Sequence, residues 1–107
     1  MPTDAVFTAL ADPTRRTVLD TIAARAGITA TELAADLPVT RQAVAKHLHV
    51  LAAAELVAGE RAGRETHWRA TPAPLNDAIA WMARVGSAWD DRLAALERSA
   101  HGPRRAP

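Results

Sequence analysis

The stretch from residue 29 to residue 51 constrains the fold most, because two helix signatures follow one another with almost no chain between them. Thr29 begins the first helix as an N-cap, with Glu32 three residues later in the capping-box position, and Pro38 ends it. Thr40 then caps a second helix. Two short helices joined by a tight turn predict a helix-turn-helix.

The helix that Thr40 begins carries apolar residues at intervals of four and three, which is typical of a helix packed along one face. Val44, Leu48 and Leu51 form this stripe, and the helix is expected to end near Ala54. Successive helical residues turn by about 100°, so the residues that point the opposite way can be identified. This outward face consists of Gln42, Lys46 and His49, with Arg41 and Ala45 along one border and Ala43 along the other.

Two further helices are expected before this pair. The first spans residues 3 to 11, where apolar residues recur at helical spacing. Asp12 and Pro13 then provide an N-cap followed by a proline at the first helical position, where a proline fits a helix best. The second helix therefore begins there and ends before Gly27, where we expect a C-terminal glycine.

Beyond the helix pair the pattern changes to short runs interrupted by glycine. Between residues 56 and 70 the side chains alternate with a period of two around Trp68, which indicates β-strands. Ala62, Gly63 and Arg64 provide the turn of a β-hairpin. Because a hairpin alone is only marginally stable, this one must pack against the helices.

Pro72 and Pro74 precede the last predicted helix, which runs from about Leu75 to Ser99. Its apolar residues recur at alternating intervals of four and three, the pattern of a coiled-coil seam. Residues 101 to 107 contain a glycine and two prolines and are expected to form a disordered tail. The seam consists of Leu75, Ile79, Met82, Gly86, Trp89, Leu93 and Leu96.

A length of 107 residues fits one compact domain, which we assign to residues 1 to 100. The chain has no cysteine, and no apolar run reaches the roughly 18 residues of a membrane helix, so we expect a cytoplasmic protein without disulfides. The net charge of +1 says little about a partner. Residues 39 to 70, however, contain five Lys or Arg against three Glu, with three of the four histidines.

The order of these elements and several short runs of sequence resemble the ArsR family of bacterial winged-helix repressors. The runs are Ala-Asp-Pro-Thr-Arg-Arg at 11 to 16, Glu-Leu-Ala at 32 to 34, Ala-Val-Ala-Lys-His-Leu-His-Val-Leu at 43 to 51, Glu-Leu-Val at 55 to 57, and Gly-Arg-Glu at 63 to 65 followed by Trp68 and Arg69. The resemblance covers nearly everything from Val6 to Leu96. It implies a mainly α fold with a small β-hairpin, a winged helix-turn-helix of five helices and a two-stranded wing. It also implies a transcriptional regulator that represses by occluding a promoter.

Metal sensing, which many ArsR-like proteins perform, is not expected in this chain. Ala34 and Ala35 stand where those proteins carry cysteines in the third helix. In the last helix, where other members place Asp, His and Glu ligands, Asp77 has no neighbouring His, and only Glu97 and His101 stand four residues apart. We therefore predict no metal site and no cofactor, and leave a small-molecule effector open.

The resemblance implies that the outward face of the second helix of the pair reads double-stranded DNA. Gln suits bidentate pairing with adenine, Lys suits guanine acceptors or phosphate, and small Ala side chains allow close approach to a thymine methyl. The helix start can hold a phosphate, and arginines beside the hairpin tip can reach the DNA backbone. The expected DNA contacts are Thr40, Arg41, Gln42, Ala43, Ala45, Lys46, His49, Arg61 and Arg64.

The seam of the last helix is expected to pack against a second copy of the chain. Gly86 supports this, since glycine inside a helix costs about 1 kcal/mol relative to alanine and suits the close approach of another backbone. A two-fold dimer reads a pseudo-palindromic operator. The predicted homodimer interface, to which the first helix also contributes, consists of Val6, Phe7, Leu10, Leu75, Ile79, Met82, Gly86, Trp89 and Leu93.

Two other functions compete with DNA reading. The same fold can present its apolar seam to a different protein, as an interaction module without specific DNA reading, and the polar helix face is then only a solvated surface. Thr40 is then only a cap. An enzyme is disfavoured because there is no cysteine, Gly-rich phosphate loop or metal-ligand cluster, and because Ser87 and Ser99 lie in the seam helix or at its end.

Overall fold

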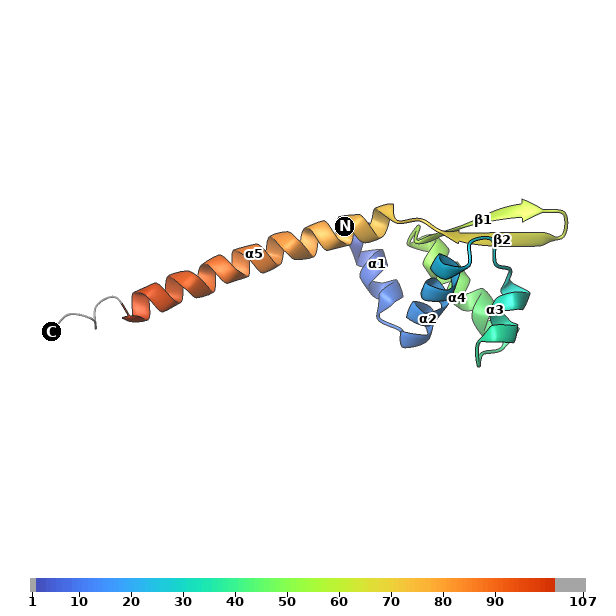
Figure 1. The fold of residues 1–107 in the computed structure, drawn as a ribbon, viewed down its shortest axis with the longest axis horizontal. Coiled ribbons are helices and arrows are strands. Elements are labelled where there is room, and N and C mark those ends of the chain that lie inside the picture. Colours follow the sequence, from blue (N-terminus) through green and yellow to red (C-terminus); the bar gives the residue numbers. More distant parts are fainter. Residues whose placement is uncertain (1, 102–107) are drawn as a thin grey trace.

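The computed structural model describes residues 2 to 101 and contains the predicted elements in the predicted order (Figure 1). The fold is mainly helical with one two-stranded antiparallel hairpin, as a winged helix-turn-helix requires. The elements are α1 (Pro2–Leu10), α2 (Pro13–Ala24), α3 (Ala30–Asp36), α4 (Arg41–Ala53), β1 (Val57–Ala62), β2 (Glu65–Ala70) and α5 (Ala73–His101).

The predicted tail at 101 to 107 lies outside the described residues, except for His101, at which α5 ends. Within residues 2 to 101, no helix combines the length and the apolar character that crossing a membrane demands.

The predicted capping residues begin the helices. The Asp12 carboxylate accepts a hydrogen bond from the backbone N–H of Arg15 at 2.9 Å, at the start of α2. At the start of α3 the capping box is complete: the Glu32 N–H donates to Thr29 Oγ1 at 3.2 Å, and the Thr29 N–H donates to Glu32 Oε1 at 3.0 Å. These bonds satisfy backbone groups that have no partner inside the helix.

Two arginines at the start of α2 close the C-terminal end of α1. Arg15 Nε donates to the Ala9 carbonyl at 2.8 Å, and Arg16 donates to the Leu10 carbonyl at 2.6 Å. The last carbonyls of a helix lack partners within it and carry partial negative charge, so guanidinium groups suit them. These bonds fix the angle between α1 and α2.

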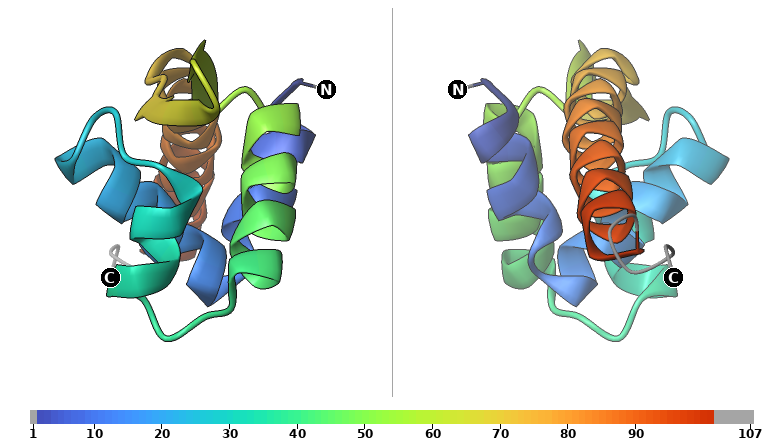
Figure 2. Two further views of the ribbon diagram at one scale, coloured as in Figure 1. Left: turned by 90° about the vertical axis from the view of Figure 1, so that its right-hand side faces the viewer. Right: turned by 90° about the vertical axis from the view of Figure 1, so that its left-hand side faces the viewer.

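The core lies between the helices and the base of the hairpin. Val44, Leu48 and Leu51, the predicted inward stripe of α4, are at most 3% exposed and pack with Ile22 of α2 and Leu33 of α3. Figure 2 shows α2, α3 and α4 gathered beneath the hairpin. Burial of this stripe fixes the orientation of α4 about its own axis, and with it the side of the helix that faces solvent.

The hairpin turns where the sequence predicts. Ala62 pairs with Glu65, so Gly63 and Arg64 form a two-residue turn. Gly63 has a φ of +63°, and a positive φ at the first central position alone is the signature of a type II′ turn, which glycine makes without strain.

The loop between α2 and α3 extends the hairpin sheet. The Gly27 N–H donates to the Trp68 carbonyl at 2.7 Å, and the Trp68 N–H donates to the Ile28 carbonyl at 2.9 Å. Gly27, expected as a C-terminal helix glycine, instead uses its φ of +89° to direct this N–H toward β2, and Arg25 caps α2. The N–H of Gly27 therefore bonds to β2 of the hairpin and does not cap α2.

Gly59 makes room for the wing's aromatic residue. It lies opposite Trp68 on the neighbouring strand. A Cβ at Gly59 would come within 2.7 Å of Thr66 Cγ2 and 3.1 Å of the Trp68 ring. Glycine is therefore required here by the close approach of two side chains.

α5 leaves the body as a lone helix of 29 residues, about 43 Å long. Only its first turns touch the rest of the chain: Ala78 is 2% exposed, and the Trp81 ring packs edge-on against Phe7 of α1, with centroids 5.5 Å apart. From Met82 to Ala100 every residue is exposed.

Val6 was predicted to lie in the dimer interface, and its position in the structure corrects this. The side chain is 1% exposed and belongs to the core of its own chain, so it has no surface to offer a partner. Helical spacing groups Val6 with Phe7 and Leu10, but those two are only half-buried.

Replacement of Gly59 by alanine tests the contact with Thr66. We expect Gly59→Ala to lower the free energy of unfolding by about 1–3 kcal/mol, as overpacked sites do, when urea unfolding is followed by circular dichroism. Thr66→Ser, which removes the nearest methyl group, should recover part of this loss in the double variant. A Gly59→Ala protein as stable as the wild type would show that the close approach is not present in solution.

Acid should weaken the fold through its two capping carboxylates. The hydrogen bond from the Arg15 backbone lowers the pKa of Asp12 below its ordinary value of 3.8, and those from Thr29 lower the pKa of Glu32 below 4.5. A lowered pKa contributes stability above the unfolded value, and this stability is lost as the pH falls through the folded value.

The urea midpoint should therefore fall between neutral pH and about pH 3. Asp12→Asn and Glu32→Gln should each show a shallower fall, because they lack one of the titrating groups. Equal slopes in all three proteins would contradict the assignment.

Candidate nucleic-acid interface

The outward face of α4 is held in place by its cap and by its buried stripe. Thr40 Oγ1 accepts a hydrogen bond from the Ala43 N–H at 3.1 Å and starts the helix. Ala43 is half-buried at the edge of the face. The remaining predicted contact residues of α4 all lie exposed on this side, namely Arg41, Gln42, Ala45, Lys46 and His49.

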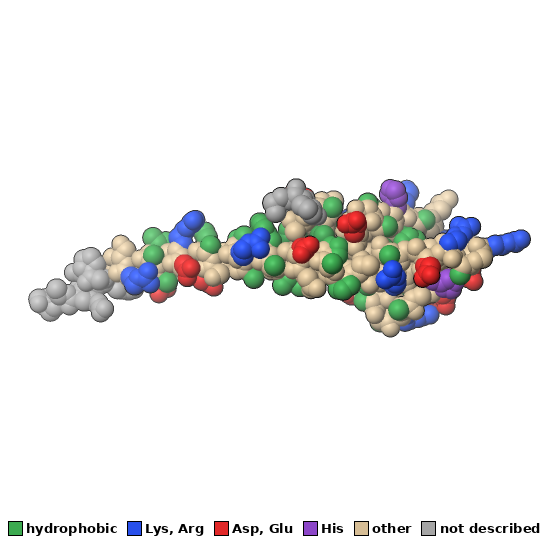
Figure 3. Space-filling model, turned by 90° about the horizontal axis from the view of Figure 1, so that it is seen from above, with side chains coloured by type: hydrophobic (Ala, Val, Ile, Leu, Met, Phe, Trp, Pro, Cys, Tyr) green, Lys and Arg blue, Asp and Glu red, His purple; other side chains and the backbone are tan. Residues whose placement is uncertain are grey.

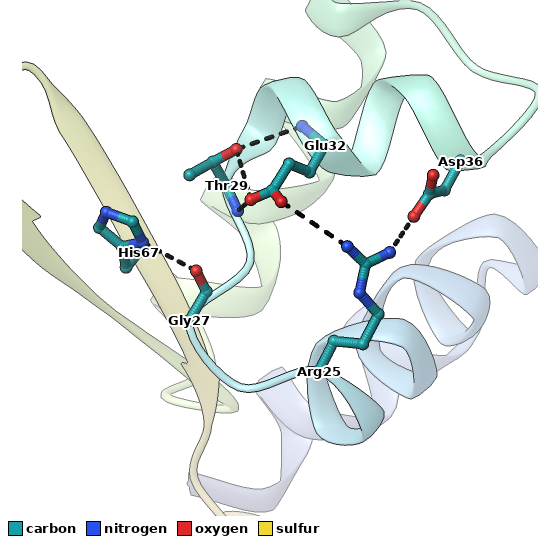
Figure 4. A network of polar contacts seen from close by, with 6 residues as sticks. All are labelled: Arg25, Gly27, Thr29, Glu32, Asp36 and His67. Carbon is teal, nitrogen blue, oxygen red and sulfur yellow. Dashed lines mark hydrogen bonds and ion pairs between the residues drawn. The ribbon is translucent and has the colours of Figure 1, made fainter.

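A polar network fixes α3 relative to α2 (Figure 4). The Arg25 guanidinium, from the end of α2, forms an ion pair with Glu32 at 3.6 Å and a hydrogen bond with Asp36. All three side chains are about half exposed, so each pair contributes no more than about 1 kcal/mol. The main effect of the network is to orient α3 relative to α2, because Glu32 and Asp36 of α3 both contact Arg25, the residue that caps α2.

The same network reaches the hairpin through His67. The ring Nδ1 of His67, on β2, lies 2.8 Å from the Gly27 carbonyl and donates to it (Figure 4). This bond lies beside the backbone pairing of Trp68 with Ile28. The hairpin and the two helices of the helix-turn-helix are therefore held as one unit.

The two arginines predicted beside the hairpin tip differ in their surroundings. Both are exposed. Arg61 Nε donates to the Gly63 carbonyl at 3.3 Å and is held against the turn. None of the ion pairs found within residues 2 to 101 involves Arg64. Figure 3 shows basic and histidine side chains around this end of the molecule and hydrophobic side chains along α5.

A groove of about 430 Å³ separates α4 from the hairpin. It brings together four of the predicted contact residues, Arg41, Ala45 and His49 of α4 and Arg64 of the turn. The other five, Thr40, Gln42, Ala43, Lys46 and Arg61, do not line it. The predicted surface is therefore divided between an open helix face and a groove beside it.

Several groove residues were not predicted from the sequence. Ala52 lies at the end of α4, and Thr66 and Trp68 lie on β2. The period-two alternation of β2 places Thr66 and Trp68 on one face of the strand, but which element lies opposite them depends on long-range contacts. Among the described residues, no group of three or more His, Cys, Asp or Glu side chains is arranged to hold a metal ion.

Comparison with known proteins places this arrangement among helix-turn-helix regulators. A helix-turn-helix domain family matches residues 10–60. The chain is 48% identical over 67 residues to the HTH-type transcriptional regulator YuzN of Bacillus subtilis, covering 57% of this chain and 73% of YuzN. It is 31% identical over 88 residues to the transcriptional repressor SdpR of the same organism, covering 82% of this chain and 97% of SdpR.

A solved structure gives the same result for nearly the whole chain. The ArsR-like transcriptional regulator from Rhodococcus sp. RHA1 superposes with a TM-score of 0.84 at 44% sequence identity, covering 92% of each chain. An alignment that covers 92% of this chain must include most of α5, so the likeness extends beyond the helix-turn-helix.

Proposed function

The chain belongs to the ArsR-like family of helix-turn-helix transcriptional regulators, and on this basis we propose that it is a homodimeric repressor that reads a pseudo-palindromic operator through α4. The observation that carries the proposal is the outward face of α4, polar and basic, on a helix whose opposite face is buried. Because the relatives are transcriptional regulators, we assign DNA binding to this face.

Each part of the surface has a chemical role in the proposed complex. Gln42 and Lys46 protrude from the first two turns of α4, where an amide and an ammonium group can meet base edges in the major groove. Thr40, with the first-turn backbone, binds a phosphate. Arg64 reaches the DNA backbone or minor groove from the turn, while Arg61 supports the turn beside it.

Repression is supported by SdpR, which is a transcriptional repressor and aligns over 97% of its length. A dimer bound across a promoter prevents the polymerase from occupying it. This mechanism needs no ligand or enzyme activity, only affinity for the operator.

Selection from a random duplex pool tests the DNA-reading proposal. We expect the wild type to enrich a pseudo-palindrome. Gln42→Ala should cost about 1–3 kcal/mol at one position in each half-site and relax the sequence preference there. Arg64→Ala should weaken binding to all sequences and reduce the salt slope by about one unit per half-site.

Arg84→Ala is the matched control, because Arg84 is an exposed arginine of α5, remote from α4. It should bind DNA like the wild type. If no sequence is enriched, and Arg64→Ala has the same salt slope as Arg84→Ala, the protein does not read DNA, and the interaction-module function takes its place.

The dimer proposal rests on the exposed apolar side chains of α5. Ile79, Met82, Val85, Trp89, Leu93 and Leu96 are between 44% and 61% exposed. A contiguous apolar stripe of this length is rare on a monomer and marks an interaction surface. A second copy of the chain carries the same stripe, and the likeness to family members that share α5 favours that partner.

Gly86 favours an antiparallel pairing of the two α5 helices. It interrupts the stripe with a notch, and apart from the adjoining turns of α5 itself nothing lies within 4 Å of the position that a Cβ would take there. In an antiparallel pair centred between Ser87 and Ala88, Gly86 of one protomer faces Trp89 of the other. The next layers pair Met82 with Leu93 and Ile79 with Leu96.

Interfaces pack as densely as protein cores, so a large side chain opposite a small one is favoured. A parallel pair would instead place Trp89 against Trp89 and leave Gly86 facing Gly86. Phe7 of α1, whose ring packs against Trp81 in the first turns of α5, extends the proposed interface, and the half-buried Leu10 follows it on α1.

Cysteine substitutions distinguish the two pairings, since the chain has no cysteine of its own. We expect Ile79→Cys mixed with Leu96→Cys to give a disulfide-linked heterodimer on oxidation, and either variant alone to give little. A parallel pair would give the opposite result. Sedimentation should show Gly86→Leu to be more monomeric, although a leucine favours an isolated helix by close to 1 kcal/mol over glycine. An unchanged dimer in that variant would contradict the notch.

A further inference from the structure

We propose that the groove between α4 and the hairpin binds an aromatic carboxylate, and that this ligand and DNA exclude one another. The inference rests on the proposed function, because it assigns a regulator to the same surface. Ala34 and Ala35 replace the cysteines through which related regulators sense metals, so a signal for this protein must bind elsewhere. The proposed ligand would be such a signal.

The size and walls of the groove suit a small ring system. Its volume of about 430 Å³ falls within the range of roughly 300–1,000 Å³ that is typical of ligand sites. Ala45 and Ala52 of α4 form an apolar wall, and Leu48, which belongs to the core, lies behind them. The two alanine side chains are too short to fill the space between α4 and β2, so a planar group can enter.

Trp68 provides an aromatic surface on the other side. Its half-buried ring lines the groove from β2 and is held by packing against the strand at Gly59. A fixed indole favours offset stacking or edge contact with another ring, which contributes about 0.5–1.5 kcal/mol beyond simple burial. An aliphatic ligand would not gain this contribution.

The charges at the opening select an anion. Arg41 of α4 and Arg64 of the turn both line the groove, and neither takes part in an ion pair found within residues 2 to 101. His49 lies on the same wall, and Glu65 is the one acid among the lining residues. A guanidinium binds a carboxylate through two parallel hydrogen bonds, so a single carboxylate next to the ring matches this opening.

Exclusion of DNA follows from shared residues. Arg41, Ala45, His49 and Arg64 line the groove and also belong to the proposed DNA surface. A bound carboxylate offsets one of the two positive charges that Arg41 and Arg64 would otherwise present to phosphates, and it holds their guanidinium groups at the groove. By linkage, DNA must weaken the binding of the carboxylate by the same factor.

The probe is 2-naphthoate, with 2-naphthylmethanol as the neutral analogue of the same ring. Isothermal titration calorimetry of the wild type, without DNA, should show one site per chain for the acid and none for the alcohol. Arg41→Gln should weaken the binding of 2-naphthoate by about tenfold, the effect of losing one charge-assisted pair. The acid, but not the alcohol, should raise the apparent Kd of the selected operator.

A filling substitution separates the groove from the DNA surface. Ala52 lines the groove but is not among the proposed DNA contacts, and Ala53, next to it, is exposed and lies outside the groove. Ala52→Met should lose at least about tenfold in 2-naphthoate affinity while binding the operator like the wild type. Ala53→Met, the matched control, should keep both affinities. Thermal unfolding of both variants verifies that they fold.

Three results would overturn the proposal: no calorimetric binding of 2-naphthoate, equal affinities in Ala52→Met and Ala53→Met, or ligand binding that leaves the operator Kd unchanged. A wild type that binds 2-naphthoate but no DNA contradicts the proposed function and the exclusion. The ligand site is then still decided by calorimetry on the two alanine variants.

Discussion

Backbone pairing between Ile28 and Trp68 joins the hairpin to the helices, and the geometry of the proposed DNA-binding surface depends on it. A two-stranded hairpin alone is only marginally stable, so its direction must come from outside. The loop after α2 supplies that direction through an isolated β-bridge to β2. Gly59 allows the Trp68 ring to close over the sheet, and His67 adds a hydrogen bond to the same loop. The wing and α4 therefore keep a fixed separation.

Features decided by neighbouring residues could be predicted from the sequence. The caps at Asp12, Thr29 and Thr40 each involve a residue three positions away, so a short stretch of sequence contains both partners. The buried stripe of α4 and the turn at Gly63 also follow from local rules of helix periodicity and turn conformation. These features were enough to establish the order of elements and the outward face of α4.

Features that depend on distant contacts could not be predicted in the same way. Val6 and Phe7 both lie at helical spacing from Leu10, yet the packing of α1 against α5, α2 and α4 buries Val6 and leaves Phe7 half-buried. The local sequence predicts that Gly27 ends a helix, but its N–H donates a hydrogen bond to the Trp68 carbonyl of β2, some forty residues later. The groove requires α3, α4 and β2 together, and no one segment contains its walls.

Because most of α5 is exposed in the single chain, the activity of the proposed dimer depends on the concentration of the protein. Nineteen residues, from Met82 to Ala100, have no contact that buries them within their own chain. In the proposed dimer, the stability of that helix is gained only by association, and so it follows mass action. At low abundance, the concentration of assembled repressor then rises with the square of the chain concentration, and a cell that doubles synthesis gains close to fourfold in operator-competent protein. The amount of such a regulator bound to its operator therefore changes more steeply than its own expression, before any ligand is involved.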